Sequence, residues 1–355
     1  MSSLRPSVLL SIWSDSRIGR ILADIGQGKT RETQLALTKI VVLDGFAVDP
    51  GDNPWPQLSG ERELIVYPRT SRAEIFERGS SADILVTNKT ILDAELLEKL
   101  QKLKFVSVLA TGYNVVDIEA ARRKGIPVSN VPSYGTDTVS QYTMALILEL
   151  CHHVGEHAAS VAQGEWGSSA DWCYWNSPQI ELRDLTLGIV GFGRIGQRVA
   201  ELGRAFGMRV LYATPSGRPV SSLGEPVDIE TLFSESDFVS LHCNLSASNY
   251  EFVNMALLSR MKRSAYLINT ARGQLVHESD LADALRRGLL TGAALDVLSA
   301  EPPKPGNPLL HAPRCLITPH MAWASLAARR RIVRTTAENI EAFLRGAPMN
   351  VVNSA

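Results

Sequence analysis

The sequence has few of the features that mark secreted or membrane proteins. Its 355 residues include only four cysteines, and no two of them stand in a Cys-x-x-Cys spacing. So few thiols in so long a chain are typical of reduced cysteines rather than of a disulfide framework, and they predict a cytoplasmic protein. No apolar run approaches the roughly 20 residues that a membrane span needs, so no membrane partner is expected.

An excess of charge of one sign is also absent. The chain has 36 Lys and Arg against 37 Asp and Glu, so it has no broad basic field that would attract nucleic acid. Hydrophobic residues make up 45% of the chain, which is enough for two cores in a protein longer than one core usually serves. His153 and His157 are spaced by four residues but do not form a recognised zinc motif, so no metal site is predicted.

The order of the predicted elements indicates parallel sheets. From residue 39 onward, short β-branched runs alternate with helical stretches, which is the pattern of an α/β fold. The first series contains four predicted strands, at 39–43, 64–67, 83–87 and 105–109. A long helix at 137–153 precedes the second series, a doubly wound sheet of six predicted strands at 186–190, 209–213, 238–242, 265–269, 292–296 and 316–318. Residues 1–38 lack this alternation and are interpreted as an N-terminal extension.

A glycine motif follows the first strand of the second series. Gly191, Gly193 and Gly196 form a Gly-x-Gly-x-x-Gly pattern that comes directly after an apolar strand and opens a helix. In this setting the first glycine allows a tight turn, the second lets the backbone approach a pyrophosphate, and the third lets the helix pack against the strand. The helix N-terminal amides, at Arg194 and Ile195, then face the phosphates. The motif predicts a dinucleotide cofactor.

An acidic residue at the end of the next strand usually accepts the ribose hydroxyls of NAD, and here it is missing. The strand at 209–213 continues into Thr214, and no Asp or Glu occurs between Glu201 and Glu225. Thr214, Ser216 and Arg218 could bind a 2′-phosphate, which favours NADP or the use of both cofactors. The alternative is that Arg218 is a solvated surface charge and that NAD binds through its other contacts.

Three residues suited to 2-oxo acid chemistry follow later strands of the second series. Arg272 can bind a carboxylate and a carbonyl oxygen together through its planar guanidinium. His320 can give a proton to the substrate oxygen as hydride reaches carbon. Glu301 would favour the charged form of that imidazole if the two side chains touch. Each residue alone is weak support, but all three follow strand ends on the side where an open sheet binds its ligands.

With these motifs the sequence resembles the D-isomer-specific 2-hydroxy acid dehydrogenases, from about residue 39 to residue 353. The sequence motifs that carry the resemblance lie at residues 190–196, 269–273, 296–302 and 318–320. It implies that Arg272, Glu301 and His320 are the catalytic residues. Further phrases at 87–90, 110–117 and 134–139 are similar to the glycerate dehydrogenase, or hydroxypyruvate reductase, branch.

The resemblance also implies further site residues. The backbone amides around Thr111 and Gly112 are expected to bind the substrate carboxylate, and Asp296 the nicotinamide carboxamide. The residues expected to line the cofactor site are Thr138, Cys243 and Ala271. Trp323 is either part of the pocket wall or a core residue, and the two interpretations are about equally favoured.

The family architecture implies two doubly wound α/β domains. Residues 134–321 would form a Rossmann NAD(P)-binding domain inserted in a flavodoxin-like substrate domain made of 39–133 and 322–355. An aromatic loop carrying Trp166, Trp172, Tyr174 and Trp175 is implied to be the arm of a homodimer, unless its own chain buries it.

Two functions are consistent with these features. The first is an oxidoreductase that transfers hydride between NAD(P)H and a small 2-oxo acid, with hydroxypyruvate to D-glycerate or glyoxylate to glycolate as the leading reactions. The alternative is an NAD(H)-sensing binding protein of the corepressor type without metabolic turnover, because such corepressors resemble the same family. The branch-specific phrases favour the enzyme.

Overall fold

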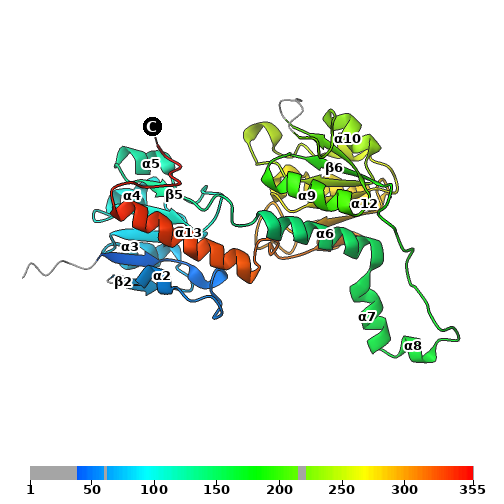
Figure 1. Ribbon diagram of the computed structural model, residues 1–355, viewed down its shortest axis with the longest axis horizontal. Coiled ribbons are helices and arrows are strands. Elements are labelled where there is room, and N and C mark those ends of the chain that lie inside the picture. The colour runs from blue at the N-terminus through cyan, green and yellow to red at the C-terminus, as the bar shows by residue number, and fades with distance from the viewer. Residues whose placement is uncertain (1–37, 60–61, 215–220, 355) are drawn as a thin grey trace, which may run out of the picture. The chain divides into compact units, whose positions relative to one another are not determined.

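Two parallel β-sheets carry the fold (Figure 1). The structure is a computed structural model, and it describes residues 38–59, 62–214 and 221–354. Most of the predicted extension, residues 1–37, therefore lies outside the described residues, as do Ser216 and Arg218. None of the described helices is both long enough and apolar enough to cross a membrane.

The first sheet has five strands in the order β2-β1-β3-β4-β5. The strands are β1 (Lys39–Val42), β2 (Glu63–Val66), β3 (Ile84–Thr87), β4 (Phe105–Val108) and β5 (Val128–Ser129). The helical segments of this part are η1 (Gly45–Ala47), α2 (Pro56–Ser59), η2 (Arg72–Glu74), α3 (Ile75–Gly79), α4 (Ala94–Lys99) and α5 (Ile118–Arg123). The β-branched residues of β1 and β3 are buried on both faces, as a parallel sheet covered by helices requires.

The four strands predicted for this sheet are present, but the prediction missed β5. This strand has only two residues, too few for a hydrophobic period to show. The C-terminal segment holds it: the Val352 amide donates to the Val128 carbonyl at 2.8 Å, and the Asn353 side chain accepts from the Val128 amide at 2.9 Å. A contact across more than 200 residues thus completes the sheet edge.

The second sheet has seven strands in the order β12-β11-β10-β9-β6-β7-β8. The strands are β6 (Thr186–Val190), β7 (Arg209–Ala213), β8 (Glu225–Pro226), β9 (Phe238–Leu241), β10 (Tyr266–Asn269), β11 (Gly292–Leu295) and β12 (Cys315–Ile317). The helical segments are α6 (Thr136–His152), α7 (Val154–Ala162), α8 (Glu165–Ser168), α9 (Arg194–Ala205), α10 (Ile229–Glu235), η3 (Ala247–Asn249), α11 (Met255–Leu258), η4 (Gly273–Leu275) and α12 (Glu278–Arg286). The prediction of six strands was wrong by one, because β8 is another two-residue strand.

The strand order places a topological switch beside β6. The chain runs from β6 to β7 and β8 on one side, and then crosses to β9 and onward on the other. Ligands of open α/β sheets bind at the carboxyl ends of the strands near such a switch. The glycine motif follows β6 directly, so it lies at this point of the sheet.

The last helix, α13 (Leu326–Leu344), packs on the first sheet rather than on the second (Figure 1). Ile332 and Ile340 share a core with residues of β1, and Phe343 stacks on Phe105 of β4 with ring centroids 4.5 Å apart. Segments that precede and follow the second sheet in sequence therefore share the core of the first sheet. The exact domain limits stay a prediction.

Candidate active site

The three glycines of the motif meet different surroundings. A Cβ on Gly191, which has φ +93°, would lie 2.5 Å from the backbone nitrogen of Cys243, and a Cβ on Gly196 would lie 2.2 Å from the Gly191 carbonyl oxygen. Both contacts are too close for any side chain, so these two glycines allow the close packing of the turn, β9 and α9. A Cβ on Gly193 would meet no atom within 4 Å among the described residues. Gly193 therefore leaves open space beside the turn, at the N-terminus of α9.

This open space lies at the N-terminus of α9, and it fits a pyrophosphate. Gly193 is the N-cap, and within the described chain no side chain caps the helix there and no acidic residue stands in its first turn. The first-turn amides are thus available to an anion, and the helix dipole favours one. Arg194 donates to the Pro132 carbonyl at 3.1 Å, while Ile195 packs against the core.

Thr214 comes directly after β7, the neighbour of β6, and the Gly191 amide donates to the carbonyl of Ala213 at 3.0 Å. The structure thus brings Thr214 beside the glycine turn, where the adenosine side of a dinucleotide is expected. Since Ser216 and Arg218 fall outside the described residues, their predicted contacts with a 2′-phosphate stay predictions.

Three further predicted cofactor residues lie on segments near this edge. The Thr138 hydroxyl hydrogen-bonds the hydroxyl of Ser325 at 2.7 Å, and the Ala271 amide donates to the Asn269 side chain at 3.0 Å. Cys243 packs its backbone against Gly191, and burial raises the pKa of its thiol, which disfavours the reactive thiolate.

His320 and Glu301 form the closest functional pair. The imidazole Nδ1 lies 2.5 Å from Oε2 of Glu301, and each side chain keeps about a third of its surface exposed, 28% and 34%. Burial tends to raise the pKa of Glu301. The hydrogen bond and charge of His320, the Leu298 amide and the charge of Lys89 together outweigh burial, so the pKa of this carboxyl is lowered. With Nδ1 engaged, Nε2 is the nitrogen left to face a substrate.

The loop that carries His320 is fixed by Asp296, which follows β11. The buried carboxylate of Asp296 accepts hydrogen bonds from the Thr318 hydroxyl at 2.7 Å and from the amides of Met321 and Ala322 at 2.9 and 2.8 Å. His320 itself has φ +51°, in the left-handed region that favours glycine. These three bonds hold an otherwise unfavourable backbone conformation in place. An ionised carboxylate can accept about four hydrogen bonds, so one acceptor position of Asp296 remains for the predicted nicotinamide carboxamide.

The segment that precedes Glu301 is held by residues that the sequence analysis did not single out. The carboxylate of Glu278, at the start of α12, accepts from the Ser299 amide at 2.7 Å and from the Asn307 side chain at 2.8 Å. Gln274 donates to the Ser299 carbonyl at 2.8 Å. Only the structure reveals these partners, because they are more than 20 residues from the loop that they fix.

Arg272 extends from the end of β10 toward the first sheet. Its Nη1 donates to the Ala271 carbonyl at 2.7 Å, and its Nη2 would lie 2.9 Å from a Cβ on Gly112. Thr111, beside Gly112, donates its hydroxyl to the Val131 carbonyl at 2.8 Å, which fixes the turn after β4. The structure thus brings together Arg272 and the Thr111–Gly112 backbone, the predicted substrate-binding groups.

Trp323 lies at the margin of the core of the first sheet. It is partly buried against that core and meets the ring of Tyr134 edge-on, with centroids 6.2 Å apart. The hydroxyl of Tyr134 is deeply buried, which raises its pKa to about 12, and the charge of Arg272 acts on it in the opposite sense. Trp323 thus has core contacts and also lies in the neighbourhood of Arg272, so both interpretations of this residue stand.

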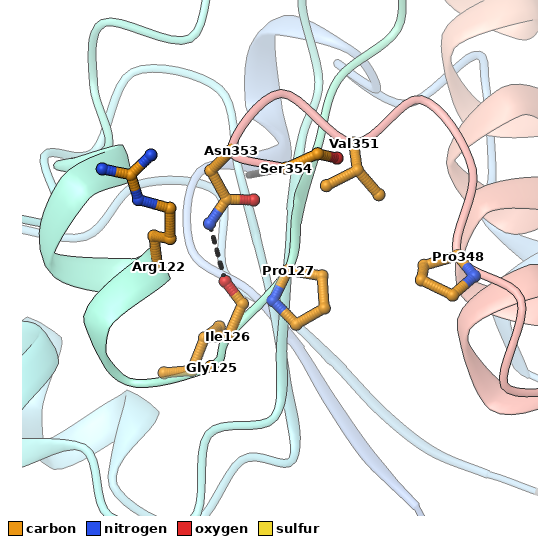
Figure 2. A pocket seen from close by; sticks show the side chains of 8 residues that line it. All are labelled: Arg122, Gly125, Ile126, Pro127, Pro348, Val351, Asn353 and Ser354. Carbon is orange, nitrogen blue, oxygen red and sulfur yellow. Dashed lines mark hydrogen bonds between the residues drawn. The ribbon is translucent and has the colours of Figure 1, made fainter.

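A cavity elsewhere on the surface is lined by Arg122 of α5, the turn that precedes β5 and the C-terminal segment (Figure 2). Its one ionisable side chain among the lining residues, Arg122, pairs with Glu119. The Asn353 side chain donates to the Ile126 carbonyl at 2.9 Å, so the polar groups here serve the fold. No predicted site residue lines this cavity, and we assign it no role.

The doubly wound sheet and its glycine turn define a dinucleotide-binding α/β protein. A model of the D-isomer specific 2-hydroxyacid dehydrogenase NAD binding domain matches residues 144–322. The hydroxypyruvate reductase of Blautia hydrogenotrophica is 46% identical over 320 residues, or 89% of this chain and 99% of that protein. The glycerate dehydrogenase of Methylorubrum extorquens is 40% identical over 320 residues, with the same shares.

Solved structures are similar over the same length. A protein of Thermus thermophilus superposes with a TM-score of 0.78 at 37% identity, covering 88% of this chain and 99% of its own. An acyclic imino acid reductase, solved in complex with NADPH and D-Arg, superposes with a TM-score of 0.76 at 30% identity, with the same coverage. This chain belongs to the D-isomer specific 2-hydroxyacid dehydrogenase family, which confirms the family predicted from the motifs. The matched NAD binding domain indicates a nicotinamide cofactor.

Proposed function

We propose that this protein reduces a small 2-oxo acid, with hydroxypyruvate to D-glycerate as the leading reaction and glyoxylate to glycolate as the second. The observation that carries the proposal is the His320–Glu301 pair at 2.5 Å, which lies at the same sheet edge as Arg272 and the glycine turn. The likeness to a hydroxypyruvate reductase and a glycerate dehydrogenase over 89% of the chain supports this substrate class.

Each residue has a distinct task in this reaction. Arg272 and the amides around Thr111 and Gly112 bind and orient the substrate carboxylate. Protonated His320 donates from Nε2 to the carbonyl oxygen, and Glu301 holds the opposite nitrogen and balances the charge. The glycine turn would hold the pyrophosphate of the cofactor, whose reduced nicotinamide would supply a hydride. This hydride and the proton from His320 would together convert the substrate carbonyl into a hydroxyl group. The reverse reaction returns the proton to His320.

For the cofactor, we propose NADP, or both NADP and NAD. The lack of any Asp or Glu between Glu201 and Glu225 removes the carboxylate that would repel a 2′-phosphate. Thr214, Ser216 and Arg218 are the proposed partners of that phosphate, and Asp296 is the proposed partner of the carboxamide. The ratio of kcat/KM for NADPH and NADH, measured in the wild type and in Arg218→Ala, tests this assignment. An unchanged ratio in the variant would remove the role of Arg218.

We also propose that the arm formed by α7, α8 and the following loop covers a second copy of this chain in a homodimer. Trp166, Trp172 and Trp175 are 53%, 86% and 66% exposed, which is unusual for such large apolar side chains within one chain. Sedimentation velocity of the wild type and of Trp172→Ser tests this. A monomeric wild type at micromolar concentration would contradict the proposal.

The domain limits 39–133 with 322–355, and 134–321, remain part of the proposal, as does a cytoplasmic location. The four cysteines are unpaired in the described chain, as a reducing compartment would keep them.

The activity itself is tested by the loss of absorbance at 340 nm when the purified protein meets NADH or NADPH with hydroxypyruvate, glyoxylate or pyruvate. Turnover of hydroxypyruvate that disappears in His320→Gln would support the enzyme. Binding of the cofactor without turnover of any 2-oxo acid would instead favour the sensing protein of the corepressor type.

A further inference from the structure

Lys89 stands in the turn after β3, and its backbone is held in one conformation. The carboxylate of Asp44 accepts hydrogen bonds from three successive amides, those of Asn88, Lys89 and Thr90, at 2.7, 2.6 and 2.7 Å. A carboxylate that receives three short amide bonds fixes a turn firmly. The Lys89 side chain therefore leaves the sheet from a defined point.

The sheet order puts that point beside the substrate-binding turn. Strand β3 pairs with β4 in parallel register, with Thr87 opposite Val108, so the turns after the two strands meet at the same edge. The turn after β4 includes Gly112, whose backbone lies against the guanidinium of Arg272. Lys89 and Arg272 thus approach one site from different sheets.

The Lys89 side chain is exposed to solvent at this edge of the first sheet. Burial lowers the pKa of Lys89 and the charge of Arg272 lowers it further, while Glu301 and Asp44 act in the opposite direction. Lys89 in turn helps to lower the pKa of Glu301. Within the described residues, Lys89 makes no ion pair or side-chain hydrogen bond of its own.

Two neighbouring cations repel each other. An ammonium and a guanidinium at one site therefore gain from an anion or an oxygen acceptor that enters between them. Lysine offers three donors and no acceptor, so it selects ligand oxygens rather than ligand donors. Because Arg272 and the Thr111–Gly112 amides already serve the carboxylate, the additional donor suits another oxygen of the substrate.

Resting on the proposed reduction of 2-oxo acids, we propose that Lys89 is a specificity-determining residue that donates a hydrogen bond to the C3 oxygen of the substrate. This contact favours 2-oxo acids that carry a C3 hydroxyl group, such as hydroxypyruvate. Glyoxylate has no C3 and pyruvate has only a methyl group there, so neither gains from it.

The test compares Lys89→Met with the wild type on hydroxypyruvate, glyoxylate and pyruvate at one saturating cofactor concentration. A lost hydrogen bond from a charged donor predicts that kcat/KM for hydroxypyruvate falls at least about 10-fold, while the values for the other two change less than about 3-fold. Lys89→Arg should recover part of the preference. Lys102→Met, at an exposed lysine of the turn after α4, is the matched control and should keep the wild-type ratio.

The outcomes separate this inference from the proposed function. A wild type that turns over no 2-oxo acid ends the proposed function itself. If the wild type is active and Lys89→Met lowers kcat/KM equally for all three substrates, Lys89 binds the shared carboxylate and the inference is overturned. An unchanged kcat/KM for all three substrates would also overturn it. Thermal unfolding checks that Lys89→Met is folded, and if it is not, the substrate ratios of Lys89→Arg and Lys89→Gln decide.

Discussion

The imidazole of His320 and the carboxylate of Glu301 lie 2.5 Å apart, although 19 residues separate them in the chain. Two different sets of bonds fix the partners. Asp296 holds the backbone on both sides of His320, and Glu278 holds the segment that precedes Glu301. The pair is therefore a product of the surrounding loops rather than a chance contact of two mobile side chains.

Replacing His320 or Arg272, the two groups proposed to face the substrate, should slow the reaction in different ways. His320→Gln removes proton transfer, so we expect kcat to fall by about 10²–10⁴-fold with a small change in KM. Arg272→Lys keeps a positive charge but loses the two-pronged geometry, so KM for the oxo acid should rise and kcat/KM should fall by at least about 10²-fold. Steady-state kinetics of both variants check this. Equal behaviour of the two would argue against separate roles.

Glu301→Gln should move the pH profile of reduction. The charge and hydrogen bond of His320 lower the pKa of Glu301, which means that carboxylate and imidazolium stabilise one another. Without the carboxylate, the protonated donor is less favoured, so the alkaline limb of kcat/KM should shift to lower pH. A profile from about pH 5 to 10 with saturating cofactor measures this. An unmoved limb would show that Glu301 does not act through His320.

Lys89 should add a second alkaline dependence that appears only with hydroxypyruvate. The pKa of Lys89 lies below the ordinary lysine value because of burial and the charge of Arg272, against the opposing charges of Glu301 and Asp44. Its ammonium should therefore lose its proton at a lower pH than an ordinary lysine, and KM for hydroxypyruvate should rise as it does. In Lys89→Arg the rise should vanish, since arginine stays charged. A rise that persists in this variant would belong to another group.

Glu278→Ala should damage the site at a distance. The substitution removes the acceptor of the Ser299 amide and of the Asn307 side chain, so the Glu301 segment loses its anchor. We expect an about 10-fold loss of kcat and a displaced pH profile similar to that of Glu301→Gln. Glu95→Ala, at an exposed position in the first turn of α4, is the matched control and should change neither. A loss of thermal stability with a normal pH profile would indicate a purely structural role.

Gly193→Ala and Gly196→Ala should separate cofactor binding from folding. A Cβ on Gly193 meets open space and its φ of −76° suits alanine, so the melting temperature should stay within about 2 °C while KM for the cofactor rises at least about 10-fold. A Cβ on Gly196 would lie 2.2 Å from the Gly191 carbonyl oxygen, so that variant should lose stability by about 1–3 kcal/mol. Differential scanning fluorimetry and cofactor titration measure both. A Gly193→Ala variant with normal cofactor affinity would contradict the pyrophosphate assignment.

Local features of the sequence were sufficient to predict the class of fold. Buried runs such as Ile84–Thr87 and Thr186–Val190 alternate with helices. This alternation predicts parallel sheets, whatever the order of the strands in each sheet. The glycine motif likewise predicted the turn between β6 and α9, because its three glycines all lie within that one strand–helix junction. The two-residue strands β5 and β8 escaped prediction, since their pairing depends on neighbours and not on a period of their own.

The sequence by itself determined the dinucleotide turn, the family and the candidates Arg272, Glu301 and His320, because each stands in a short phrase whose chemistry is local. Only the tertiary structure decided what these residues touch. It joined His320 to Glu301 and engaged Asp296 with the His320 loop. It also placed the turn of Lys89 at the same sheet edge as the turn of Gly112, which lies against Arg272. Periodicity and turn chemistry act over a few residues, whereas such contacts depend on sheet order and on packing between distant segments.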